Sequence, residues 1–216
     1  MLLSAIFVIV FFAAIVQFGL GMGFGLAAAP LLALLDPELV PAPTLFIGFM
    51  TSALGAMRER EAIIWAEVAN ASFGRVVGVL AATLLLAGLQ DRETFMLVFG
   101  VMVAIAVFLS LAGWRLPYTR ASLVTMALVS GLMGTITSVG APPLAIVYQD
   151  RKASEARPTL AAFFAIGCAI SLTGLYASGW ASTKDFVLAL LMVPAMLAGL
   201  VASRILKGRF DARFRP

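Results

Sequence analysis

Histidine is absent from this 216-residue chain, and cysteine occurs once, as Cys168. Histidine is the commonest metal ligand and the side chain best suited to proton transfer near neutral pH. A single cysteine excludes an internal disulfide and a cluster of cysteine metal ligands. The sequence therefore predicts no metal and no cofactor. It also argues against an enzyme, because it offers no buried pair of carboxylates that could act as acid and base.

Charged residues are scarce as well, at 12% of the chain, whereas hydrophobic residues make up 62%. A soluble domain carries about 25% charged and about 45–50% apolar residues, and a globule of this length has too little interior to bury so much apolar surface. The composition therefore indicates lipid as the solvent. The net charge of +4 comes from basic residues in the links between apolar stretches, where such residues set orientation. We expect no nucleic acid as a partner.

Seven apolar blocks follow one another, separated by short charged or proline-containing links. Their approximate ranges are 2–35, 41–57, 66–89, 94–113, 121–148, 159–179 and 186–205. A helix needs about 20 residues to cross the hydrocarbon core, and the alternating pattern of a membrane β-barrel is absent. We therefore expect an all-α, polytopic transmembrane helical bundle that forms one domain over residues 1–216.

The first block is too long for one crossing, and the fifth repeats its plan. A helix over residues 2–35 would be about 51 Å long at about 1.5 Å per residue. The glycine-rich run at 19–25 interrupts it and Pro30 follows, and each glycine costs a helix about 1 kcal/mol relative to alanine. The fifth block has the same plan, with a small-residue run at 134–140 followed by Pro142. Each block therefore predicts a helical hairpin broken by glycine and proline.

The two predicted hairpins also correspond to each other in sequence. When Gly19 is aligned with Gly131, Pro30 falls on Pro142. Internal repeats are typical of secondary transporters. We therefore divide the chain into repeat one, residues 1–114, and repeat two, residues 115–216, which is short at its C-terminus. Chance similarity between two apolar stretches is the alternative.

Basic residues in the links predict how the chain crosses the membrane. If both hairpins go in and come back, one face holds only Arg92 and Lys184, and the other holds the basic residues at 58–60, 115–120, 151–157 and the C-terminus. This asymmetry satisfies the positive-inside rule. We predict a multi-pass protein of the cell inner membrane with an external N-terminus, a cytoplasmic C-terminus and two inverted repeats. Re-entrant arms and short spanning arms give the same sidedness.

The first broken block contains GLGMGFG at residues 19–25, which leads to Pro30, and a second copy runs from Gly131 to Pro143. These two segments resemble the sulfite exporter TauE/SafE family of membrane permeases. The order of the remaining helices extends the resemblance over nearly the whole chain. The resemblance implies a secondary transporter, a permease or exporter, that carries sulfite, a sulfonate or a related small anion by alternating access.

Members of that family usually have a further C-terminal helix, which this chain lacks. A non-transporting or oligomer-dependent membrane subunit is therefore the alternative function, and an intramembrane enzyme is less favoured. No nucleotide-binding loop is present, so a gradient must drive transport. The expected partners are a small anionic substrate, the lipid bilayer, H⁺ or Na⁺ as a coupling ion, and a second copy of the chain in a homo-oligomer.

Donors for an anion concentrate at the two hairpin turns. Helix N-termini expose backbone N–H groups and favour anions through the helix dipole, and glycine lets an oxyanion approach the backbone. Nearby hydroxyls and one intramembrane guanidinium, roughly 13 Å deep at about 1.5 Å per residue, add further donors. The predicted substrate-binding residues are Gly21, Gly23, Gly25, Pro30, Arg75, Thr135, Thr137, Ser138, Gly140 and Pro142.

Other roles for these residues stay open at the level of sequence. Small residues at the turns could simply allow close helix packing, as they often do in membranes. Arg75 could extend to the interface or pair with Glu67 or Glu61. Several intramembrane polar residues are interpreted mainly as interhelical hydrogen-bonding groups: Gln17, Thr44, Thr51, Ser52, Asn70 and Ser72.

Overall fold

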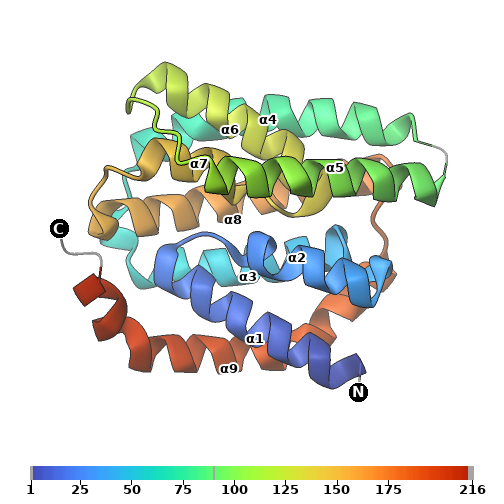
Figure 1. Cartoon of the computed structure of the whole chain (residues 1–216), viewed down its shortest axis with the longest axis horizontal. Coiled ribbons are helices and arrows are strands. Elements are labelled where there is room, and N and C mark those ends of the chain that lie inside the picture. The colour runs from blue at the N-terminus through green and yellow to red at the C-terminus, as the bar shows by residue number, and fades with distance from the viewer. Residues whose placement is uncertain (1, 90, 214–216) are drawn as a thin grey trace.

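The computed structural model describes residues 2–89 and 91–213 (Figure 1), and within these ranges every regular element is a helix. The main helices are α1 (Leu2–Leu20), α2 (Phe24–Leu35), α3 (Ala42–Arg58), α4 (Trp65–Ala87), α5 (Arg92–Leu111), α6 (Arg120–Thr137), α7 (Ala141–Tyr148), α8 (Ala153–Ala177) and α9 (Thr183–Arg213). Two short 3₁₀ helices, η1 (Pro37–Leu39) and η2 (Arg60–Ala62), lie in links. The predicted all-α fold is confirmed.

Among the described residues, six helices are long and apolar enough to cross a membrane: α1, α4, α5, α6, α8 and the part of α9 up to Ile205. Helix α2 has 12 residues and α7 has 8. At about 1.5 Å per residue these are roughly 18 and 12 Å long, shorter than a hydrocarbon core of about 30 Å. The returning arms of the two predicted hairpins are therefore shorter than a full crossing.

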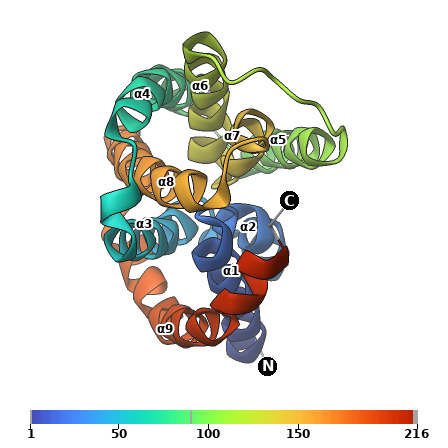
Figure 2. The same ribbon diagram turned by 90° about the vertical axis from the view of Figure 1, so that its left-hand side faces the viewer.

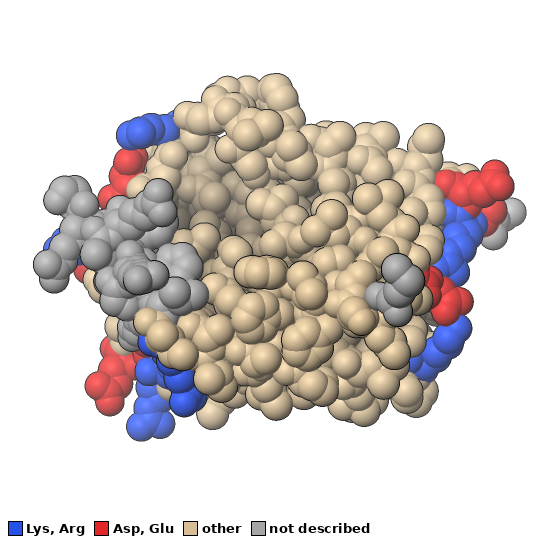
Figure 3. Space-filling model, turned by 60° about the horizontal axis from the view of Figure 1, so that its bottom comes forward, with Lys and Arg blue, Asp and Glu red and all other residues tan. Residues whose placement is uncertain are grey.

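The outside of the molecule is apolar between two charged ends. Figure 3 shows Lys, Arg, Asp and Glu gathered at opposite ends of one face, with a broad band between them that carries none. Large apolar side chains point outward in this band, such as Leu84, which is 76% exposed. Exposed leucine over several turns of helix is stable in lipid and unfavourable in water, so the surface fits a membrane-spanning bundle.

The charged links divide between these two ends. Lys184 Nζ lies 2.6 Å from Glu38 Oε2, which joins the link after α2 to the beginning of α9. At the other end, Arg157 Nε lies 2.9 Å from Glu59 Oε2, which joins the link after α3 to the beginning of α8. Helix α1 runs from the first end toward the second, and α2 returns (Figure 1). Which end faces the cytoplasm stays a prediction.

Two groups of helices make up the bundle (Figure 2). Helices α4 to α8 lie in one group, and α1, α2, α3 and α9 lie in the other. The groups meet where α8 packs against α3. Helix α4 therefore lies in a different group from the helices that precede it in the chain, and it packs beside α6. Helix α9 packs beside α1.

Glycines bring the backbones of α4 and α6 into contact. A Cβ atom added to Gly78 would lie 2.8 Å from the Leu132 amide nitrogen, and one added to Gly131 would lie 2.5 Å from the Arg75 carbonyl oxygen. Real Cβ atoms essentially never approach other atoms closer than 3.0 Å. Small residues are what allow such close packing of helices in lipid. This contact brings the Arg75 side chain to the place where α4, α6 and α8 meet.

Candidate functional site

The first helix break lies between α1 and α2. Gly21 and Gly23 have φ angles of 76° and 104°, in the region that glycine adopts without steric cost. Gln17 fastens this turn, because its Oε1 accepts a hydrogen bond from the Phe24 amide at 3.0 Å. Its Nε2 donates to the Gly21 carbonyl oxygen at 3.2 Å and to Ser52 Oγ at 2.9 Å. One amide side chain thus caps both arms and ties them to α3.

The second break lies between α6 and α7, and hydroxyl groups close it. Ser138 has a φ of 64°, and its hydroxyl donates to the Pro41 carbonyl oxygen at 2.8 Å. The Thr137 hydroxyl donates to the Met133 carbonyl oxygen at 2.7 Å and accepts from the Val139 amide at 3.0 Å. Both hydroxyls were predicted as donors to an anion. In this conformation both hydroxyl protons are donated to backbone carbonyl oxygens of the protein.

The two turns touch each other through their backbones. A Cβ atom on Gly25 would overlap the Ser138 carbonyl oxygen and would lie 2.6 Å from its carbonyl carbon. Gly21 has a similar contact on its other side, where a Cβ atom would lie 2.8 Å from the Arg157 carbonyl carbon. Glycine is therefore needed at 25 for the contact with the second turn and at 21 for the contact with α8. The fold brings together two glycine-containing turns that are more than a hundred residues apart in sequence.

Arg75 of α4 reaches the second turn and is 1% exposed. Its Nη1 donates to the Ser130 carbonyl oxygen at 3.1 Å and to Ser130 Oγ at 3.0 Å. Its Nη2 donates to Ser171 Oγ at 3.1 Å. Both serines are held in turn, because Ser130 Oγ donates to the Gly140 carbonyl oxygen at 2.6 Å and Ser171 Oγ lies 2.9 Å from Thr135 Oγ1. The guanidinium is thus positioned by neutral groups.

No carboxylate among the described residues pairs with Arg75, and its Nε has no hydrogen-bond partner. Glu67, a partner considered from the sequence, pairs instead with Arg151 at 3.0 Å and accepts from the Tyr148 hydroxyl at 3.0 Å. Burial to 1% also excludes extension of Arg75 to the interface. A buried charge without a partner is expensive. Ionisable residues inside a membrane span are functional candidates for that reason.

Three glycines make room for the guanidinium. A Cβ atom on Gly167 would lie 2.9 Å from Arg75 Nε, one on Gly140 3.0 Å from Nη1, and one on Gly134 3.1 Å from Nη2. On the remaining side, the Phe163 ring centroid lies 5.7 Å from Cζ, within reach of a cation–π contact. The pocket is therefore shaped to the planar fork of an arginine.

A cavity of about 30 Å³ lies between the two turns, and we call it the Arg75 cavity. Its polar lining consists of Gln17, Thr44, Ser52, Arg75, Ser138 and Cys168, and Gly23, Gly25 and Gly140 complete the wall at the turns. The volume is roughly that of one water molecule in the liquid. An anion with several heavy atoms therefore requires the two turns to move apart.

Half of the ten predicted site residues line this cavity, namely Gly23, Gly25, Arg75, Ser138 and Gly140. The other five do not. Thr135 and Thr137 hold hydrogen bonds beside it, Gly21 packs on α8, Pro30 lies half-buried further along α2, and Pro142 lines a different pocket. The structure thus brings the cores of both turns and Arg75 together, and it leaves the flanking prolines outside.

Sequence analysis missed the direct partners of Arg75. Ser130 and Ser171 were not among the candidates, because a single serine in an apolar helix gives no signal until the packing of α4, α6 and α8 is known. Gln17 and Ser52 were interpreted as interhelical hydrogen-bonding groups. They do bond to each other, but they also line the cavity. The signal available for Gln17 was an amide side chain inside an otherwise apolar block.

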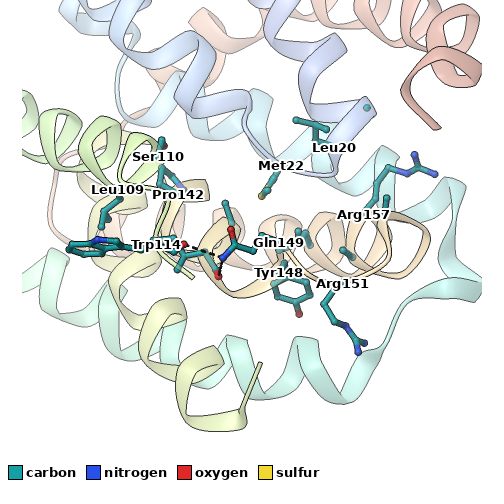
Figure 4. A pocket seen from close by; sticks show the side chains of 17 residues that line it. Leu20, Met22, Leu109, Ser110, Trp114, Pro142, Tyr148, Gln149, Arg151 and Arg157 are labelled. Carbon is teal, nitrogen blue, oxygen red and sulfur yellow. Dashed lines mark hydrogen bonds between the residues drawn. The ribbon is translucent and has the colours of Figure 1, made fainter. Parts of the chain in front are cut away.

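A second pocket of about 340 Å³ opens at the end of the molecule that carries residues 151–157, and we call it the Arg151 pocket (Figure 4). Leu20 and Met22 of the first turn line one side, and Pro142 and Tyr148 of α7 line another. The lining is mostly apolar, with Arg151 and Arg157 together at one side (Figure 4). This pocket reaches the flanks of both turns.

A third pocket, of about 330 Å³, lies at the opposite end and includes Glu38, Pro41, Arg92 and Lys184. We call it the Lys184 pocket. The Lys184 ammonium donates to Glu38 and lowers the pKa of that carboxyl group, and the charge of Arg92 acts in the same direction. Pro41 connects this pocket to the site, because its carbonyl oxygen accepts the Ser138 hydroxyl. Each end of the molecule thus has a pocket next to at least one of the turns.

These features define a polytopic α-helical membrane protein in which two broken helices meet around one buried cation. Comparison with known proteins narrows the class. The family model described as sulfite exporter TauE/SafE matches residues 6–216. The chain belongs to this family, which is one of membrane permeases for sulfite and related anions. No curated protein and no solved structure matches the chain.

Proposed function

We propose that this chain is a secondary transporter that carries a small oxyanion, such as sulfite or a sulfonate, through the Arg75 cavity. One observation carries the proposal. Arg75 is a buried guanidinium with neutral partners and no ion pair among the described residues. Its charge costs several kcal/mol to bury, and an anion in the cavity would offset that cost. An arginine fork also suits the geometry of an oxyanion.

The first turn supplies the backbone donors. The Phe24 amide donates to Gln17, but among the described residues no acceptor is found for the amides of Gly25 and Leu26 at the same helix N-terminus. Amides in that position and the helix dipole both favour an anion. The second turn offers fewer donors, because α7 begins with Ala141 followed by two prolines, and proline has no N–H group. We infer that the anion rests between Arg75 and the beginning of α2.

Alternating access is supported by the exchange of helices between the two halves of the chain. The long arm of the second hairpin, α6, packs through Gly78 and Gly131 on α4. The long arm of the first, α1, packs on α9, where a Cβ atom on Gly199 would lie 2.7 Å from Ala14 Cβ. In both pairs, a helix of one predicted repeat thus packs on a helix of the other. Rocking of the two groups about α3 and α8 would separate Gly25 from Ser138 and enlarge the cavity, as expected of inverted repeats.

The two end pockets provide the approaches to the site. The Arg151 pocket reaches the first turn at Leu20 and Met22, and the Lys184 pocket reaches the second turn through Pro41. We place the Arg151 pocket on the cytoplasmic side of the inner membrane, as the positive-inside rule predicts. Transport would be driven by the gradient of the anion itself or by coupling to H⁺ or Na⁺, in a single domain that acts alone or as a homo-oligomer.

Uptake into proteoliposomes tests this function. We expect liposomes containing the wild-type chain to accumulate radiolabelled sulfite or methanesulfonate faster than protein-free liposomes. Arg75→Gln removes the charge and keeps an amide, and it should abolish the difference. Arg115→Gln is the matched control, because the Arg115 side chain is 72% exposed and pairs only with Asp150 at the surface. Equal uptake by both variants, in protein shown to be folded and inserted, would contradict the proposal.

A further inference from the structure

We infer that the oxyanion crosses with a single negative charge. The Arg75 cavity would then accept a monoanion, such as hydrogensulfite or an alkyl sulfonate, and reject a dianion such as sulfate. This inference rests on the proposed function, because it specifies the charge of the anion that binds in the same cavity. It follows from how many charges the cavity contains and from how deeply they are buried.

Among the described residues, Arg75 is the one charged residue that lines the cavity. Its hydrogen-bond partners, Ser130 and Ser171, are neutral. Cys168 is the other titratable side chain in the lining. A second cation is therefore not available where the anion would rest.

Apart from Arg75, the charged residues described on the helices around the cavity lie at the ends of the bundle. Glu67 of α4 precedes Arg75 by eight positions, or about 12 Å at about 1.5 Å per residue, and pairs with Arg151. On α8, Glu155 pairs with Arg151 and Arg157 pairs with Glu59. Four further charged side chains lie at helix ends or in links next to them: Arg58, Arg60, Glu61 and Arg120. Helices α1, α2 and α7 contain no charged residue.

This charge distribution discriminates between monoanions and dianions. The Born cost of removing an ion from water rises with the square of its charge, so a dianion costs about four times as much as a monoanion of the same size. Its attraction to one guanidinium at a given distance is only about twice as strong. A monoanion beside Arg75 leaves the cavity neutral, whereas a dianion leaves it with an uncompensated negative charge. The balance therefore favours the monoanion.

Three anions test this inference in proteoliposomes that have the same pH inside and outside. Methanesulfonate is a monoanion throughout the neutral range, sulfate is a dianion, and sulfite loses its last proton near neutral pH. We expect methanesulfonate uptake to be independent of pH and sulfate uptake to equal that of protein-free liposomes. Uptake at fixed total sulfite should fall about tenfold for each pH unit above the second pKa of sulfurous acid, as the monoanion fraction does.

Two controls separate the charge of the substrate from other effects of pH. Sulfite uptake is divided by methanesulfonate uptake at the same pH, after subtraction of uptake by protein-free liposomes. The series is repeated with Cys168→Ala, since Cys168 is the titratable neighbour of Arg75 in the cavity. The ratio of sulfite to methanesulfonate uptake should fall with pH in this variant too, whatever its overall rate.

The outcomes distinguish the inference from the proposed function. Sulfate uptake as fast as methanesulfonate uptake would overturn the inference and leave the proposed function standing. Sulfite uptake that stays constant or rises with pH, while methanesulfonate uptake is constant, would do the same. Uptake of none of the three anions would remove the proposed function, and the inference with it.

Discussion

Gly25→Ala tests whether the two broken helices are locked together by backbone contact. The new Cβ atom would overlap the Ser138 carbonyl oxygen and would lie 2.6 Å from the carbonyl carbon. Ordinary Cβ contacts begin near 3.4 Å, so the turns must separate by at least about 0.8 Å (3.4 less 2.6). The obstacle is backbone on both sides, so no flexible side chain can swing away. The substitution therefore forces apart the two turns that enclose the Arg75 cavity.

The expected loss of stability can be estimated from two contributions. Overpacking of a close contact costs about 1–3 kcal/mol. Movement of Ser138 also stretches its 2.8 Å hydrogen bond to the Pro41 carbonyl oxygen, which contributes about 0.5–1.5 kcal/mol. For a chain of this length, 1 kcal/mol lowers the unfolding midpoint by about 2–4 °C. The two contributions add to about 1.5–4.5 kcal/mol, so we expect Gly25→Ala to lower the midpoint by roughly 3–18 °C.

Thermal unfolding in detergent measures this effect through Cys168, a buried thiol and the single cysteine of the chain. A maleimide dye becomes fluorescent when unfolding exposes that thiol. The matched control is Gly100→Ala in α5, because a Cβ atom at Gly100 meets nothing within 4 Å. Alanine there should leave the midpoint unchanged or raise it slightly, since it favours a helix by up to about 1 kcal/mol over glycine. Equal midpoints for the two variants would refute the close contact between the turns.

Three further predictions concern the first turn, the ion pair at one end and the topology. Gln17→Leu removes the hydrogen bonds to Phe24, Gly21 and Ser52. Because each bond contributes about 0.5–1.5 kcal/mol, the substitution should lower the unfolding midpoint in the same assay. An unchanged midpoint would show that Gln17 does not stabilise the turn. Lys184 lowers the pKa of Glu38 in the folded protein. This ion pair therefore stabilises the fold at pH values above the unfolded-state pKa of Glu38. The stabilisation is lost as the pH falls through the lowered pKa of the folded state. Lys184→Gln should therefore lower the midpoint at neutral pH and have no effect in strong acid, and a difference that persists in acid would contradict this assignment. Finally, single cysteines can be placed at 38, 59, 115 and 184 on a Cys168→Ala background. Those at 38 and 184 should react with an impermeant thiol reagent from outside, and those at 59 and 115 should not. Labelling of 38 and 59 from the same side would exclude the predicted topology.

The helix breaks could be predicted from the sequence because their causes are local. The glycines at 21 and 23 adopt left-handed backbone. The second break lies just before the two prolines in the first turn of α7, which lack the N–H groups needed to continue α6. The lengths of the apolar blocks likewise matched most helices, as for block 66–89 and α4, which covers Trp65–Ala87. The block at 186–205 was shorter than α9, which continues to Arg213. Hydropathy ends at the basic run, but lysine and arginine are good helix formers.

The partners of the polar side chains could not be predicted, because they depend on packing between distant segments. The Ser138 hydroxyl looked like a donor available to an anion, but it bonds to Pro41, which directly precedes α3. Arg75 looked equally able to extend to the interface, and only the glycines of α6, α7 and α8 show why its guanidinium stays buried. Sequence analysis thus singled out Arg75 as a candidate. Its neutral hydrogen-bond partners, on which the proposed anion site rests, emerged only from the fold.

The measurement that most directly tests binding of an oxyanion beside Arg75 is protection of Cys168 from a small maleimide. Cys168 lines the same cavity as Arg75, so a small maleimide should react slowly with the folded protein, when the two turns move apart, and a bound anion should block the thiol. We predict that methanesulfonate slows labelling of the wild-type protein in detergent and has no effect on labelling of Arg75→Gln. A cysteine at exposed Gly100, on a Cys168→Ala background, should label at the same rate with and without the anion. Equal labelling rates of wild-type Cys168 with and without methanesulfonate, or equal protection in Arg75→Gln, would contradict the account.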